Sequence, residues 1–304
     1  MNAELTAPNT RSSATTWGVL VRALLRDRIT LSALVFVAVV VVSGVGAGFF
    51  SPHDPYAQDL LSRNDGPMTP SDNGISHILG TDALGRDQLS RLIYGSRITL
   101  TVGFASILAS GIMGTLLGIL AGYYRGWVDD LIMRIVDVQM GFPSLLLALV
   151  ILYGAGSGFF NVVLVLAVTR WMVYARVTRS LTLSLRESAF VDAARAIGCT
   201  DRRIIFRHVL PNLLSPLLVL ATMEVATVIL TEASLDFLGL GIQPPESSWG
   251  LMLAQGRQYI TTAWWLVTFP GLAILLTTLS FNLLATWVRA VSDPVQRWRW
   301  LGVR

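Results

Sequence analysis

The stretch ITLTVGFASILASGIMGTLLGILAGYY, residues 98–124, decides the fold class of this chain. It contains no charged residue and exceeds the ~20 apolar residues that a helix needs to cross ~30 Å of hydrocarbon. The whole chain has the same character, since 53% of its 304 residues are hydrophobic and only 14% are charged. A soluble domain carries about 25% charged residues. The composition therefore predicts an all-α integral membrane protein.

Five further apolar stretches bring the expected number of transmembrane helices to six. Two of them come from one uncharged run, residues 138–169, which is too long for a single span. The glycine cluster at residues 154–158 is suited to a turn that divides this run. The expected spans lie near residues 29–50, 98–124, 138–153, 159–178, 212–236 and 259–288.

The distribution of arginine predicts which face of the membrane each loop occupies. All 23 basic residues are arginine, and they exceed acidic residues in segments 1–28, 176–207 and 289–304. Loops rich in positive charge stay in the cytoplasm. With six spans, these three segments fall on one side, so both termini are expected to be cytoplasmic. Residues 51–97 carry more aspartates than arginines and are expected outside, whereas the short connection 125–137 favours neither side.

The composition also excludes several kinds of chemistry. A chain without lysine cannot form a Walker A phosphate loop or a Schiff base, so any ATP would be bound by another polypeptide. The single cysteine, Cys199, excludes an intrachain disulfide and a cysteine-based metal cluster. His53 and His77 are far apart in the sequence, and that spacing alone predicts no metal site. No catalytic residues are predicted.

Small and ionisable residues mark two features within the spans. Gly114, Gly118 and Gly122 recur every four residues and form a stripe against which another helix can pack closely.

Ionisable side chains within a transmembrane helix cost free energy unless they are paired or solvated by water. Four residues of this kind are predicted: Arg170, Glu224, Glu232 and Asp236.

Three interpretations of these four residues stay open. They can line a substrate pathway, form a proton relay, or bond between helices, with Arg170 and Asp236 reaching toward the two surfaces. Glu224 is nearest to the middle of its span and is the preferred pathway candidate.

Residues 190–211 are expected to form a short, rigid lever on the arginine-rich side. Alanines favour a helix over residues 191–197, and Gly198 is placed to end it as the C′ residue. Thr200 or Asp201 can cap a second short helix, which is expected to stop near Pro211.

This segment resembles the EAA motif of ABC importer permeases. Five positions match the motif: Ala193, Ala194, Gly198, Leu210 and Pro211. Two positions depart from it, since Asp192 replaces the usual glutamate and His208 replaces the usual isoleucine. The His-Val-Leu-Pro-Asn ending is similar to the dipeptide and oligopeptide branch of the family. Residues 80–97, 232–250 and 269–284 resemble segments of its C-type subunit, in which Asp236 replaces a usual serine.

The resemblance implies a type I ABC importer permease fold in the bacterial plasma membrane. It implies a second, B-type permease subunit, two ATPase subunits that hold ATP and Mg²⁺, and an extracytoplasmic substrate-binding protein. No cofactor on this chain and no nucleic-acid partner are expected. The EAA segment would be the coupling helix that docks on the ATPase. The apolar runs and the arginine distribution divide the chain into a cytoplasmic N-terminal segment (1–28), a first transmembrane helix (29–50) and an extracytoplasmic loop with an interfacial helix after Gly85 (51–97). A five-helix permease core that contains the coupling loop 190–211 (98–290) and a cytoplasmic tail (291–304) complete the expected organisation.

Short peptides are the cargo that this branch implies. Nickel chelates, glutathione or another small solute are alternatives within the same class. A proton-coupled secondary transporter that uses Glu224 and Glu232 is an alternative from a different class, and a lipid-facing structural subunit is a third.

Overall fold

The computed structural model describes residues 24–70 and 76–292. Most of the expected cytoplasmic segment 1–28 and of the tail 291–304 therefore lies outside the described residues. The described part of the chain contains helices and isolated bridges but no strand. Five helices are long and apolar enough to cross a membrane, and a sixth span results if one bent helix pair is counted as a single crossing.

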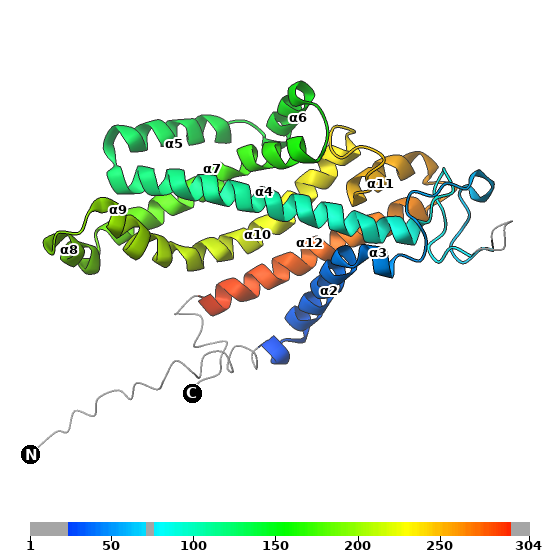
Figure 1. Ribbon diagram of the computed structural model, residues 1–304, viewed down its shortest axis with the longest axis horizontal. Coiled ribbons are helices and arrows are strands. Elements are labelled where there is room, and N and C mark those ends of the chain that lie inside the picture. The colour runs from blue at the N-terminus through cyan, green and yellow to red at the C-terminus, as the bar shows by residue number, and fades with distance from the viewer. Residues whose placement is uncertain (1–23, 71–75, 293–304) are drawn as a thin grey trace, which may run out of the picture.

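The long helices lie along one another in an elongated bundle (Figure 1). They are α2 (Arg28–Val45), α4 (Gln88–Tyr124), α7 (Phe159–Arg186), α10 (Leu210–Phe237) and α12 (Trp265–Ser292). The shorter elements are α3 (Ala47–Phe50), η1 (Leu60–Ser62), α5 (Gly126–Met140), α6 (Ser144–Ala155), α8 (Ala189–Ala196), α9 (Asp201–Ile204), η2 (Ile205–Val209), α11 (Trp249–Gly256) and η3 (Arg257–Tyr259). Helices α8 and α9 lie at one end of the bundle, whereas α11 and the segment after α3 lie at the other (Figure 1).

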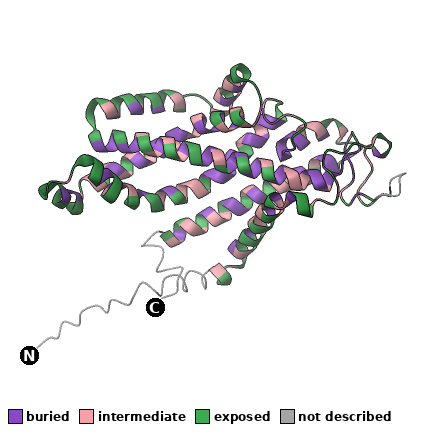
Figure 2. Cartoon of the chain, viewed as in Figure 1, coloured by how far each residue is buried: buried purple, intermediate pink, exposed green. Residues whose placement is uncertain are grey.

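Helix α2 exposes most of its apolar side chains. Only 17% of its most apolar window is buried, and Figure 2 shows this helix as largely exposed. Its exposed residues include Val35, Val39, Val42 and Val45. A contiguous apolar face of this kind is stable against hydrocarbon or another subunit rather than against water.

The glycine stripe lies where α4 packs along α7. A Cβ atom on Gly118 would lie 2.5 Å from the Ala175 carbonyl oxygen, and one on Gly122 would lie 2.7 Å from the Arg179 carbonyl oxygen. A Cβ on Gly114 would likewise collide with the α7 backbone. The absence of side chains therefore allows two helix backbones to approach each other closely.

The expected interfacial helix before the second span is not a separate element. Residues 88–124 form one continuous α-helix that Asp87 caps by accepting a hydrogen bond from the Ser90 amide. Helix formation is cooperative once nucleated, and no proline interrupts this stretch. The charged first turns therefore extend α4 beyond the expected span instead of lying across it.

The third span also differs from the prediction. All but the first residue of 125–137, expected as a connection, belongs to helix α5, which is followed after a 93° bend by α6. Gly141 and Pro143 lie in the break between them. Helix α6 has only 12 residues, too few to cross a bilayer alone. Arg179 on α7 forms a two-point ion pair with Asp129, at 2.5 and 2.6 Å, which holds α5 alongside α7. The turn at residues 154–158 is found as expected.

The expected helix end near Pro211 is wrong. Residues 205–209 form a π-helical turn in which the Leu210 amide donates to the Ile205 carbonyl, and the helix continues into α10. The wider turn accommodates a proline, which has no amide hydrogen and would crowd an α-helical carbonyl. The Asn212 side chain donates to the His208 carbonyl at 2.6 Å and satisfies one of the freed acceptors.

We predict that Gly118→Ala destabilises the bundle by about 1–3 kcal/mol, because the new methyl group collides with the α7 backbone. Gly111→Ala on the same helix is the matched control, since its Cβ would lie 3.5 Å from the Tyr174 ring, an ordinary contact. Thermal unfolding of the purified protein in detergent measures both variants. Equal melting temperatures for the two would show that the stripe is not needed for this packing.

Candidate functional site

The segment between α7 and α10, residues 187–209, is named here the α8–α9 loop. Helix α8 ends in a Schellman motif, in which the Cys199 amide donates to the Ala194 carbonyl at 3.0 Å and the Gly198 amide donates to the Arg195 carbonyl at 2.9 Å. Gly198 has φ +83°, as expected for a C′ glycine. A Cβ atom there would meet nothing within 4 Å, so the backbone conformation alone requires glycine.

Helix α8 has one face on the bundle and one face free. Val191 and Ala194 are buried, whereas Asp192 and Ala193 are exposed. The alanine pair of the motif is therefore divided between the two faces, because consecutive helix positions point about 100° apart. Three large apolar side chains of the loop are exposed and were not singled out from the sequence: Phe190 at 43%, Ile197 at 81% and Phe206 at 56%. Helix α8 and its C-cap residue Ile197 thus expose both apolar side chains and the acidic Asp192.

The α8–α9 loop is fixed to the end of α4 through Tyr123. The buried Tyr123 donates a hydrogen bond to Asp201 at 2.6 Å. The guanidinium groups of Arg186 and Arg195 lie 5.7 and 5.8 Å from the centre of the Tyr123 ring. The loop is therefore in contact with α4 as well as joined to α7 and α10.

The rest of the motif lies beside an open groove with strong positive charge. Its lining residues are Thr200, Arg202, Arg203, Phe206 and Arg207. His208 is half-buried and its ring lies 6.5 Å from that of Phe190, while Leu210 is half-buried and Pro211 is exposed at the start of α10. The groove can attract acidic side chains of a partner.

Two of the predicted ionisable residues meet inside the bundle. Arg170 on α7 forms an ion pair with Glu224 on α10 at 2.8 Å, and both side chains are nearly buried, at 13% and 12% exposed. Arg170 therefore does not reach toward the membrane surface. The Tyr174 hydroxyl, buried beside the pair, makes no hydrogen bond within the described residues.

Glu232 and Asp236 belong to a different place, one helical turn apart near the end of α10. Both are fully buried, and Glu232 lies close to Thr99 of α4. Asp236 accepts hydrogen bonds from the Ile242 amide, at 2.6 Å, and from the Ser248 hydroxyl. Asp236 thus holds the connection between α10 and α11, and the interpretation that it reaches toward the surface is wrong.

The opposite end of the bundle is held by a buried charge network around Asp82. This carboxylate forms ion pairs with Arg86, at 2.7 Å, and with Arg91, and both arginines donate to Gln255 of α11. Burial raises the pKa of Asp82, but the two arginines outweigh it and hold the pKa below its usual 3.8. The network ties the segment after α3 to α4 and α11.

Comparison with known proteins agrees with this architecture. Residues 114–298 match the family model described as binding-protein-dependent transport system inner membrane component, and residues 15–67 match the N-terminal TM domain of oligopeptide transport permease C. A glutathione transport system permease protein of Pectobacterium atrosepticum is 40% identical over 97% of this chain and 96% of its own. A di/tripeptide transport system permease protein of Pseudomonas aeruginosa is 41% identical over 87% of each chain.

The fold is shared with solved ABC transporters. An inward-facing structure of the MetNI methionine ABC transporter has a TM-score of 0.53 and 21% identity, covering 69% of this chain and 96% of the other. The chain is thus a multi-pass permease subunit of an ABC importer, a transport protein rather than an enzyme. It belongs to the family of binding-protein-dependent transport system inner membrane components.

We predict that the single variants Glu224→Gln and Arg170→Gln each impair folding or transport more than the double variant does. Either single change leaves one buried charge without its partner, which typically costs about 3–5 kcal/mol. The measurement is a double-mutant cycle on melting temperature and transport rate. Additive effects would show that the pair does not interact.

Proposed function

We propose that this chain forms one half of the translocation pathway of an ATP-driven importer for short peptides. The names of its relatives support this cargo, because they include dipeptide, di/tripeptide and glutathione transport. An extracytoplasmic binding protein delivers the peptide, and a second, B-type permease subunit completes the pathway. Two ATPase subunits, which bind ATP and Mg²⁺, dock beneath the pair.

The exposed face of α8 is the observation that carries the coupling role. Asp192, Ala193 and Ile197 project from the end of the bundle on a helix whose other face is anchored. Exposed apolar side chains beside charge are typical of a docking surface for another protein. In this proposal Asp192 makes the polar contact to the ATPase, and the arginine groove receives its acidic side chains. Ala194 supports the helix from the bundle side.

The same loop connects the two helices that carry the internal ion pair. Arg170 lies on α7, before the loop, and Glu224 lies on α10, after it. Movement of the loop on ATP binding would change the position of α7 relative to α10 and so the environment of this pair. Such a coupled movement of helices can alternate access to the pathway. We place Arg170 and Glu224 at the pathway and assign Glu232, with Asp236, to the packing around α11.

The charge distribution supports a proposed orientation in the membrane. The arginine-rich α8–α9 loop belongs on the cytoplasmic side, where an ATPase has access to ATP. The end that carries α11 and residues 51–87 would then face the binding protein outside. Both termini would be cytoplasmic.

We predict that Gly198→Val lowers uptake at least tenfold while the protein stays in the membrane, because valine disfavours a φ of +83° and the turn that orients α8 would change. Gly154→Val is the control: its Cβ also meets nothing within 4 Å, but its φ is ordinary. Vesicles containing the assembled transporter and its binding protein are supplied with a dipeptide, glutathione or a nickel chelate, with and without ATP. Uptake that needs no ATP would favour a secondary transporter instead.

The docking surface is tested by cross-linking from α8. We predict that Asp192→Cys, in a Cys199→Ser background that removes the only native thiol, is captured by a cysteine cross-linker with the ATPase. Ala194→Cys, on the buried face, should be captured much less. Equal capture at both positions, or none at Asp192, would contradict the proposed surface.

A further inference from the structure

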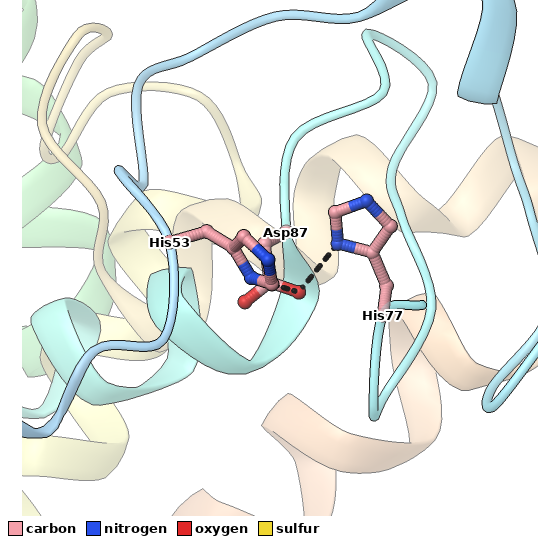
Figure 3. Close-up of side chains that lie close together, drawn as sticks. All are labelled: His53, His77 and Asp87. Carbon is pink, nitrogen blue, oxygen red and sulfur yellow. Dashed lines mark hydrogen bonds and ion pairs between the residues drawn. The ribbon is translucent and has the colours of Figure 1, made fainter. Parts of the chain in front are cut away.

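His53, His77 and Asp87 converge at the end of the bundle opposite the α8–α9 loop. Figure 3 shows both imidazole rings directed at the same carboxylate. The Asp87 Oδ1 atom lies 2.9 Å from Nδ1 of His77 and 3.7 Å from Nδ1 of His53. Each residue offers one ligand atom, and the three atoms lie within 4.8 Å of one another. From these contacts we propose that the three residues bind one divalent transition-metal ion of the Zn²⁺ type.

The backbone of each ligand is held in place before any ion arrives. The His53 amide donates to the Ser90 hydroxyl at 3.0 Å. The His77 carbonyl accepts from the Met68 and Gly80 amides at 3.0 and 3.1 Å. Asp87 is the N-cap of α4 and uses its other oxygen to accept from the Ser90 amide at 2.7 Å. Bonds of this kind orient ligands around a metal and leave the Asp87 Oδ1 atom facing the two imidazole rings.

The hydrogen bonds of this cluster do not satisfy all of its buried polar atoms. Nδ1 of His77 forms a hydrogen bond with Oδ1 of Asp87, whereas the buried Nδ1 atom of His53 makes no hydrogen bond within the described residues. A cation placed among the three atoms would use this nitrogen and would offset the carboxylate charge. A bound ion thus accounts for an orientation of His53 that its hydrogen bonds do not explain.

The donor set and spacing select the kind of ion. Zinc binds nitrogen and carboxylate oxygen at ~2.0–2.2 Å, so two ligands of a tetrahedral site lie about 3.3 Å apart. The distances of 2.9 and 3.7 Å to Asp87 bracket that value. Two imidazoles with one carboxylate favour Zn²⁺ over Ca²⁺ or Mg²⁺, which prefer oxygen ligands. The His53 side chain is 33% exposed, which leaves an open side for a fourth ligand such as water.

A metal at this position would join three segments of the chain. His53 follows α3, His77 lies in the loop before α4, and Asp87 begins α4. The ion would therefore fasten segment 51–87 to the first turn of α4. Such a site would not depend on which cargo is transported.

The test uses the full-length chain in detergent, carrying no histidine tag and stripped with a chelator. Equilibrium dialysis against ZnCl₂ should give one Zn²⁺ per chain, and His53→Ala should weaken binding at least tenfold. Asp87→Asn should also weaken it while keeping an oxygen that can cap α4. His208→Ala is the matched control, because it removes the only other histidine and should leave binding unchanged.

Two further measurements separate a metal site from a folding defect. Co²⁺ bound to the wild-type chain should give the visible absorption of a near-tetrahedral site, and His53→Ala should abolish it. Zn²⁺ should raise the melting temperature of the wild type but not that of His53→Ala, since binding stabilises only the state that contains the site. The proposal is overturned if the wild type binds Zn²⁺ no more tightly than His53→Ala while both show the same helical content.

Discussion

The close approach of the α4 and α7 backbones is the constraint on which the rest of the structure depends. In hydrocarbon, helices gain little from hydrophobic association and associate through close packing instead. Gly114, Gly118 and Gly122 provide that packing, since any side chain there would enter the α7 backbone. With α7 fixed against α4, Tyr123 reaches Asp201 in the α8–α9 loop, and the ion pair between α7 and α10 forms at a defined depth.

This arrangement gives the proposed coupling a physical route from one short helix to the interior of the bundle. The α8–α9 loop contacts α4 through Tyr123 and is joined directly to α7 and α10. The π-helical turn preserves that continuity at Pro211, where an ordinary helix would break. In the proposed coupling, a force on the exposed face of α8 would be carried into helices that hold buried charges. The Asp82 network and Asp236 stabilise the opposite end.

Two of the expectations that failed concern segments whose structure depends on distant residues. Residues 125–137 are too charged to be expected in a spanning helix, yet residues 126–140 form α5, which the ion pair between Arg179 and the buried Asp129 holds alongside α7. Residues 88–97 were expected to lie on the surface, but Asp82 holds Arg91 within the bundle as the first turn of α4. The two histidines meet only because the loop folds back onto Asp87.

The sequence by itself determined the membrane class, five of the spans and the turn at Gly198. These follow from local physics: long uncharged runs must satisfy their backbone within a helix, and a left-handed residue after a helix favours glycine. Only the tertiary structure decided which face of α8 is free, which partner each buried charge has, and that His53, His77 and Asp87 lie together. Such contacts join residues far apart in the chain, and a periodic pattern in one segment carries no information about the element that packs against it.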